Sequence, residues 1–221
     1  RGGFYAIVDP AHCGGRPQRG GFYAIVDPAH CGGRPPVDVA QQLLSGGAAL
    51  LQLRMKTGSD REHVALARAL RELTRAARVP FVMNDRADLA LLVDADGLHL
   101  GQDDLSVADA RRLLGARQLG VSTHDVQQAT QAERDGADLI GFGPVFDTFT
   151  KERPDPTVGL ATLAEVCRTV RVPVVAIGGL TPTRAQEAYR AGATWVAAIS
   201  AVTGASDVAA SARAFAPEVA P

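Results

Sequence analysis

The chain has 221 residues, of which 46% are hydrophobic, and its formal net charge at pH 7 is -1. This length and hydrophobic content are sufficient for a full core in a single domain. The near-balanced charge excludes a strongly basic or acidic surface as the basis of binding, so neither nucleic acid nor an anionic membrane is an expected partner.

The cysteines and the apolar runs indicate where the protein works. Cys13, Cys31 and Cys167 form an odd set with no metal-type spacing, which favours a reducing compartment. No apolar run approaches the roughly 18 residues that span a bilayer, and the N-terminus lacks the order of a signal peptide. We therefore expect a cytoplasmic protein that acts on small molecules. A homo-oligomer is left open.

The N-terminus contains an exact duplication. The segment RGGFYAIVDPAHCGGRP occupies residues 1–17 and recurs unchanged at residues 19–35. A repeat fold needs about three units, so two copies do not make one. Each copy holds one strand-like run followed by a Pro/Gly turn. Because the second copy is joined directly to the next expected helix, we expect it to supply the first strand. Residues 1–18 are then a surplus extension, and residues 19–221 form one domain.

The rest of the chain alternates short apolar runs with amphipathic stretches. We expect strands at residues 22–27, 50–54, 81–85, 97–100, 119–122, 139–143, 174–178 and 195–200. We expect helices at residues 37–45, 59–77, 106–114, 126–135, 160–169, 182–191 and 207–215, with Asp60 and Thr181 as N-caps. Strict alternation with eight strands predicts an α/β fold, a single TIM (β/α)8 barrel. The runner-up is an open doubly wound sheet, although no GxGxxG motif follows the first strand.

A barrel places its active groups at the C-terminal ends of its strands. Polar or glycine residues, and Ile199 beside Ser200, close or follow seven of the expected strands in this way. They are Gln52, Arg54, Lys56, Asn84, Asp85, Asp103, Asp104, Ser122, His124, Thr148, Thr150, Lys151, Gly178, Gly179, Ile199 and Ser200. Carboxylates can hold Mg²⁺, while lysine, hydroxyls and bare backbone N–H groups can hold phosphate oxygens. The combination points to diphosphate chemistry.

Each feature also has a simpler explanation when taken alone. Asp103 and Asp104 could cap the helix that follows them. The Asn84-Asp85-Arg86 segment could be a turn or an internal salt bridge. Gly178-Gly179 could be an ordinary turn, and Lys151 a solvated loop lysine. His124 could position a neighbour rather than transfer protons, and we leave it outside the predicted catalytic set.

The motifs taken together are far more specific. In chain order they are Q-L-R-x-K, N-D-R-x-D-L-A, D-G-x-H-L-G-Q-D-D, G-V-S-T-H, G-F-G-P-V-F-x-T-x-T-K, V-G-L, A-I-G-G-L and I-S-A-V. This order resembles the thiamine-phosphate synthase family, over about residues 22–215. The resemblance implies a TIM-barrel transferase that joins hydroxymethylpyrimidine diphosphate to a thiazole phosphate or its carboxylated form, giving thiamine phosphate and diphosphate.

The resemblance also implies roles for particular residues. The Mg²⁺ ligands would be Asp85 and Asp104. Contacts to the pyrimidine diphosphate would come from Gln52, Arg54, Lys56, Asn84, Ser122 and Lys151, and contacts to the thiazole phosphate from Thr148, Thr150, Gly179, Ile199 and Ser200. The catalytic set would be Arg54, Lys56, Ser122 and Lys151.

Two other functions are weighed against the synthase. A related barrel isomerase acting on the thiazole phosphate would keep the phosphate site and a histidine but need no metal. A non-catalytic sensor of phosphorylated ligands would keep only the pocket. The acidic pair Asp85 and Asp104 and the segment Thr148-Phe149-Thr150-Lys151 argue against the isomerase, and the acidic pair argues against the sensor.

Overall fold

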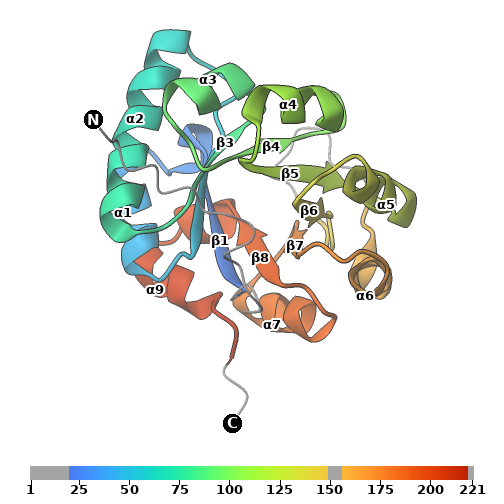
Figure 1. The fold of residues 1–221 in the computed structure, drawn as a ribbon. Coiled ribbons are helices and arrows are strands. Elements are labelled where there is room, and N and C mark those ends of the chain that lie inside the picture. The colour runs from blue at the N-terminus through green and yellow to red at the C-terminus, as the bar shows by residue number, and fades with distance from the viewer. Residues whose placement is uncertain (1–19, 149–155, 219–221) are drawn as a thin grey trace.

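The computed structural model describes residues 20–148 and 156–218, and eight parallel strands in this part of the chain close into a barrel in sequence order (Figure 1). The strands are β1 Gly21–Val26, β2 Leu50–Leu53, β3 Phe81–Asn84, β4 Gly97–Leu100, β5 Gln118–Thr123, β6 Leu139–Phe142, β7 Val174–Ile177 and β8 Trp195–Ala198. Closure is direct, because Gly21 of β1 pairs in register with Trp195 of β8. The TIM-barrel prediction is confirmed, and the open doubly wound sheet is wrong.

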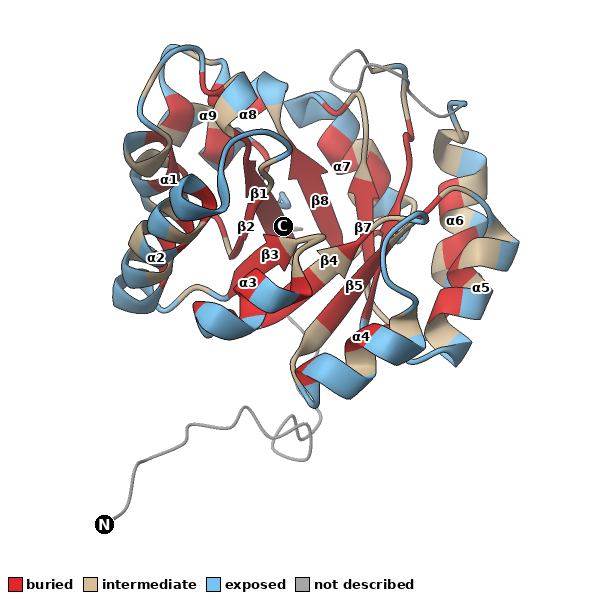
Figure 2. Ribbon diagram, turned by 90° about the horizontal axis from the view of Figure 1, so that it is seen from above, coloured by how far each residue is buried: buried red, intermediate tan, exposed pale blue. Residues whose placement is uncertain are grey.

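Helices surround the barrel. They are α1 Pro36–Ser45, α2 Asp60–Ala77, α3 Ala87–Leu92, α4 Val107–Leu114, α5 Val126–Arg134, α6 Gly159–Thr169, α7 Pro182–Arg190, α8 Ser200–Thr203 and α9 Val208–Ala214, with a short 3-10 helix η2 at Pro28–His30. Figure 2 shows the buried strands inside a ring of helices whose outer faces are exposed. None of the helices in residues 20–148 and 156–218 is both long and apolar enough to cross a membrane.

Alternation along the strands divides the core into two parts. On β1, Phe22 and Val26 face outward and join the large cluster between the sheet and the helices. Tyr23 and Ile25 face inward and pack in a smaller cluster that fills the barrel. The interior of the barrel is therefore a packed core on which a site can rest.

Helix starts follow their caps, with one correction. The side chain of Thr181 accepts a hydrogen bond from the Arg184 backbone N–H, which confirms the predicted N-cap of α7. Asp60 was predicted to cap α2, but Ser59 is the cap and forms a capping box with Glu62. In this box the Ser59 side chain accepts from the Glu62 backbone N–H, and the Glu62 side chain accepts from the Ser59 backbone N–H. Ser59 is therefore the N-cap, and Asp60 is the first helical residue.

Several strands end earlier than their apolar runs predicted. Asp85 has φ 60 and Gly178 has φ 98, and these left-handed conformations cannot continue a strand. Ser200 was placed in the last strand but begins the unpredicted short helix α8. The sixth-strand and second-strand predictions also ran one residue too far, to Gly143 and Arg54. The residues that leave the sheet in this way are the ones that approach the site.

The first strand comes from the second copy of the duplicated segment, since β1 is Gly21–Val26. Its Phe22 is buried and packs against Phe215, with ring centroids 5.2 Å apart. The end of α9 is thereby held against the first strand. The use of the second copy is what its short connection to α1 predicted. Residues 1–18, the predicted surplus extension, lie outside the described residues.

Candidate active site

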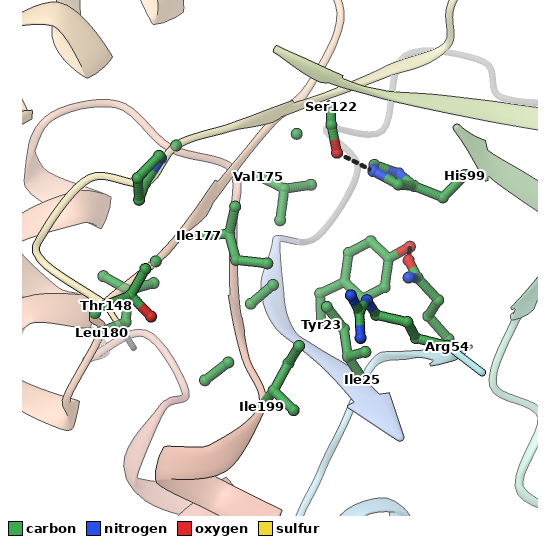
Figure 3. Close-up of a pocket in the computed structure, with 18 of the residues that line it drawn as sticks. Tyr23, Ile25, Arg54, His99, Ser122, Thr148, Val175, Ile177, Leu180 and Ile199 are labelled. Atoms are coloured by element: carbon green, nitrogen blue, oxygen red, sulfur yellow. Dashed lines mark hydrogen bonds between the residues drawn. The ribbon is translucent and has the colours of Figure 1, made fainter. Parts of the chain in front are cut away.

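A pocket of about 170 Å³ opens at the C-terminal end of the barrel (Figure 3). A cavity needs a volume of about 10–15 Å³ to hold one water molecule, so this pocket has room for a small heteroaromatic ligand. The predicted residues that line it are Gln52, Arg54, Asn84, Ser122, Thr148, Gly179, Ile199 and Ser200. The tertiary structure thus brings together side chains that are up to 148 residues apart in the sequence, from Gln52 to Ser200.

The other predicted site residues do not line the pocket itself. Lys56 and Asp85 form a pair beyond the ends of β2 and β3, and Asp104 lies in the segment after β4. Thr150 and Lys151 lie outside the described residues. Their proposed roles stay predictions.

The pocket has a polar half and an apolar half. Strands β1 to β5 contribute Tyr23, Gln52, Asn84, His99 and Ser122 to its wall, and β6 to β8 contribute Gly141, Val175, Ile177 and Ala197. The polar half offers hydrogen-bonding groups to one part of a ligand. The strand residues of the apolar half offer contact area, which suits a second ring.

Asp85 sits between a cation and a second carboxylate. Its Oδ2 lies 2.5 Å from the Lys56 ammonium nitrogen. Burial raises the pKa of Asp85, the Lys56 ammonium opposes this, and the neighbouring Asp104 carboxyl raises the pKa further. The salt-bridge alternative for Asp85 is therefore partly right, but Lys56 is the partner and not Arg86, which pairs with Asp60 and Asp88.

Asp104 does not cap the following helix. Ser106 accepts the hydrogen bond from Asp109 N and so caps α4. Asp104 instead accepts a 2.6 Å hydrogen bond from the backbone N–H of Gly101, which turns its carboxylate back toward the end of β4. The simpler explanation for Asp104 is wrong, and the carboxylate is left facing Asp85.

The two carboxylates can be tested as a place for a cation. Within the described ranges no group of three or more His, Cys, Asp or Glu side chains could hold a metal by itself. Magnesium commonly uses one or two carboxylates and completes its shell with water and substrate phosphates. Asp85 and Asp104 form such a pair, and the raised pKa of Asp85 reflects a charge that a cation would help to stabilise. The residues fit Mg²⁺ bound together with a phosphorylated substrate.

Arg54 is held in place by a residue that the sequence analysis did not select. Its guanidinium forms a short ion pair with Asp27, whose side chain is buried at the end of β1. His30 Nδ1 lies 3.3 Å from the same carboxylate oxygen. Because one carboxylate fixes the guanidinium, Arg54 enters the pocket with its orientation already set, so less entropy is lost on binding an anion.

The glycine pair lies against the loop after β6. A Cβ atom at Gly179 would stand 2.3 Å from the carbonyl oxygen of Asp147, and one at Gly178 would stand 2.5 Å from Pro144. Both glycines have positive φ. Only glycine allows the two backbone segments to approach this closely, and the approach keeps Thr148 beside Gly179 in the pocket wall.

Sequence reasoning missed two inward-facing residues of the polar half, Tyr23 and His99. His99 Nε2 lies 2.8 Å from Ser122 Oγ. The signal was available, because each is a polar residue on the inward face of an otherwise apolar strand. His124, which we left aside, does line the pocket, and its Nδ1 lies 2.6 Å from the carbonyl oxygen of Gly143.

The chain is similar to known proteins over most of its length. The family described as thiamine monophosphate synthase matches residues 22–202. The chain belongs to this family. It is 49% identical over 175 residues to the thiamine-phosphate synthase of Chloroflexus aurantiacus, covering 79% of this chain and 81% of that protein. The corresponding enzyme of Moorella thermoacetica is 48% identical over 178 residues, covering 80% and 85%.

A solved structure agrees. Thiamine phosphate pyrophosphorylase from Pyrococcus furiosus superposes with a TM-score of 0.81 at 34% identity, covering 88% of this chain and 93% of that one. The crystal structure of thiamine phosphate pyrophosphorylase from Bacteroides thetaiotaomicron has a TM-score of 0.65 at 15% identity, which shows the shared fold alone. Membership in the thiamine monophosphate synthase family makes this chain a transferase of thiamine biosynthesis with small-molecule substrates.

Proposed function

We propose that this chain joins 4-amino-2-methyl-5-hydroxymethylpyrimidine diphosphate to 4-methyl-5-(2-phosphooxyethyl)thiazole, or its carboxylated form, and releases diphosphate. The observation that supports this most directly is the placing of the Lys56–Asp85 pair and of Arg54 at neighbouring strand ends beside one two-sided pocket. At one end of the site the diphosphate needs cations and carboxylates that can hold Mg²⁺. At the other end the pyrimidine and thiazole rings must lie side by side.

The reaction can be written without a nucleophilic side chain. The bond between the pyrimidine methylene carbon and the diphosphate oxygen breaks, and its electron pair leaves on the diphosphate. The aminopyrimidine ring stabilises the resulting cation. The thiazole nitrogen then supplies the pair that forms the new carbon–nitrogen bond. With the plain thiazole phosphate no proton is transferred in this exchange, so the enzyme contributes positioning and charge stabilisation. The carboxylated form would in addition lose its carboxylate as CO₂ and take a proton from water at the same ring carbon.

Arg54 and Lys56 would neutralise the charge that develops on the leaving diphosphate, together with Lys151 from the loop after β6. Mg²⁺ held by Asp85 and Asp104 would supply further positive charge to the same oxygens. Ser122 would contact the pyrimidine from β5. Arg54 is oriented by Asp27, so its part in this arrangement needs little reorganisation.

The second substrate would be anchored through its phosphate. Gly179, Ser200 and the backbone of Ile199 lie on the β7 and β8 side of the pocket, with Thr148 beside them. The apolar residues Val175 and Ile177 leave room for the thiazole between this anchor and the pyrimidine. Holding the phosphate fixes the distance at which the thiazole nitrogen meets the pyrimidine carbon.

We place the reaction in the cytoplasm, because the two cysteines of the described chain, Cys31 and Cys167, are free thiols. A direct test is coupled turnover with both substrates, with and without Mg²⁺, following thiamine phosphate and diphosphate together. Formation of both products only with Mg²⁺ supports the proposal. A folded sample that forms neither product contradicts it, and conversion of the carboxylated thiazole phosphate alone would favour the isomerase.

A further inference from the structure

Three polar side chains of the barrel interior form a chain of hydrogen bonds under the pocket. The Tyr23 hydroxyl on β1 donates to Gln52 Oε1 at 2.6 Å, and Gln52 Nε2 on β2 donates to Asn84 Oδ1 on β3 at 2.9 Å. Tyr23 is 2% and Gln52 3% exposed. Figure 3 shows the Tyr23 hydroxyl directed along the pocket wall, away from the apolar side chains of Val175 and Ile177.

The donor and acceptor order along these hydrogen bonds matters, because rotation of an amide group by 180° exchanges its oxygen and nitrogen. If both amides were reversed, Asn84 would donate to Gln52, Gln52 would donate to the tyrosine oxygen, and the tyrosine proton would need another acceptor. The hydrophobic side chains packed with Tyr23 inside the barrel are Leu50, Val82, Leu139, Val175, Trp195 and Ala197, which offer no acceptor. A reversal would take from the buried hydroxyl the acceptor that it has in the structure, and a buried donor that loses its acceptor costs about 1–3 kcal/mol.

The protonation of the tyrosine points the same way. Burial raises the pKa of Tyr23 well above its ordinary value, so the phenol keeps its proton at any working pH. In the structure this proton is donated to Gln52 Oε1, and the Gln52 amide has its oxygen toward β1 and its nitrogen toward β3.

We propose that Tyr23 is a positioning residue, which fixes the Gln52 amide so that Asn84 presents its NH₂ group, and not its oxygen, to the substrate. Asn84 Oδ1 accepts from Gln52, so the NH₂ group of Asn84 is the part of the amide that this hydrogen bond leaves for a ligand. The guanidinium of Arg54, next along the rim, also offers only donors. This corner of the pocket is built for a group of acceptors, a diphosphate oxygen or an unprotonated ring nitrogen. The inference rests on the proposed function and adds to it the kind of group, a hydrogen-bond acceptor of the pyrimidine diphosphate, that this corner meets.

Tyr23→Phe removes the hydroxyl and keeps the ring, so Gln52 loses its orienting donor while the packing is preserved. We expect the Kd of pyrimidine diphosphate, measured by calorimetry, to rise about 5–20-fold, as the loss of one oriented buried hydrogen bond predicts. The Kd of thiazole phosphate should stay within about twofold of its wild-type value. Turnover should show the same division, with KM for the pyrimidine substrate raised and KM for the thiazole unchanged.

Tyr189→Phe is the matched control. Tyr189 is also a shielded tyrosine whose hydroxyl donates to a backbone carbonyl, that of Phe215 at 3.1 Å, but it lies on α7 outside the barrel. It should leave both dissociation constants unchanged. If Tyr23→Phe lowers only the melting temperature, as a structural hydroxyl would, and leaves the pyrimidine Kd at the wild-type value, the positioning role is wrong.

A double-mutant cycle with Asn84→Ala tests the route of the effect. If Tyr23 acts through Gln52 on Asn84, Tyr23→Phe adds little once Asn84 is gone, whereas a fully additive loss overturns the inference. The measured quantity is the Kd of pyrimidine diphosphate, so it does not depend on whether the protein joins the two substrates. Wild-type protein that binds this compound but never forms thiamine phosphate would contradict the proposed function and leave the Tyr23 comparison decisive.

Discussion

His99 Nε2 on β4 lies 2.8 Å from the Ser122 hydroxyl oxygen on β5, and two glycines clear the space for the ring. A Cβ at Gly120 would stand 2.6 Å from His99 Nδ1, and one at Gly141 would stand 3.0 Å from His99 Cε1. The imidazole therefore lies across positions where neighbouring strands carry no side chain. The hydroxyl that we expect to meet the pyrimidine is oriented by this histidine.

Gly120→Ala should disturb this pair without strain in the backbone, because Gly120 does not have a positive φ. The added methyl must displace the His99 ring from its position beside Ser122, and a shift of about 1 Å at a reacting site can cost up to 100-fold in turnover. We expect kcat to fall at least tenfold in steady-state assays, with the far-ultraviolet circular dichroism spectrum unchanged. Gly21→Ala on β1 is the control, since its Cβ would meet only ordinary contacts at 3.4 Å and beyond. Equal turnover in the two variants would show that the position of the His99 ring does not affect catalysis.

Asp85→Asn should separate function from stability. Burial raises the pKa of Asp85 above its unfolded value, so the folded protein binds that proton more tightly than the unfolded chain does. The stability that this provides is present at low pH and is lost as pH rises through the folded pKa, so the charged carboxylate destabilises the metal-free protein at pH 7. We expect Asp85→Asn to keep or raise the metal-free melting temperature and to lower Mg²⁺-dependent turnover at least 100-fold.

Asp88→Asn is the control for Asp85, with the opposite sign. Its pKa is lowered by Arg86, so its charge stabilises the folded protein above the ordinary carboxyl pKa, by a small amount because the side chain is largely exposed. Its melting temperature should fall slightly and its turnover should stay normal. A large drop in melting temperature for Asp85→Asn would contradict the assignment.

The same carboxylate predicts a pH profile. The acid limb of Mg²⁺-dependent turnover should lie at higher pH than an ordinary aspartate would give, because Asp85 must be deprotonated to hold the cation. Raising the Mg²⁺ concentration should move that limb to lower pH, since the cation competes with the proton. If the acid limb does not move with Mg²⁺ concentration, it reports the titration of a group other than Asp85.

Gly179→Ala should weaken the thiazole site in particular. Its Cβ would clash with the Asp147 carbonyl and stand 2.8 Å from Phe146, so the segment that carries Thr148 must move. We expect KM for thiazole phosphate to rise at least tenfold, with KM for the pyrimidine substrate little changed. Gly47→Ala shares the positive φ but meets nothing within 4 Å, so it isolates the backbone strain of about 1–2 kcal/mol. If the two variants are equally impaired in denaturant melts and in turnover, the close approach has no role.

Identical phenylalanines in the two N-terminal copies test which copy is used. Phe22→Ala removes a buried ring that packs on Phe215, and such a change costs about 3–5 kcal/mol. Phe4→Ala is the same change in the same local sequence, and we expect no effect on urea unfolding or turnover. Deletion of residues 1–18 should likewise change neither. If Phe4→Ala is as damaging as Phe22→Ala, the first copy also enters the fold.

The sequence by itself determined the barrel, because eight apolar runs alternating with amphipathic stretches leave few other ways to bury both faces of a parallel sheet. It also determined most of the candidate site, since barrel topology sends Gln52, Asn84 and Ser200 to the same end whatever their separation in the chain. The residue types at these positions and the glycine pair could be identified from the sequence before any contact was known.

Only the tertiary structure decided which groups meet. Sequence offered Asp104 as a helix cap and as a metal ligand; the hydrogen bond from the Gly101 N–H excludes the cap and leaves the metal role as a prediction. The role of Tyr23 depends on hydrogen bonds across three strands, and neither β1 nor β2 carries that information alone. Side-chain direction inside a barrel is set by strand register and by what neighbouring strands leave vacant, so it emerges only when the sheet closes.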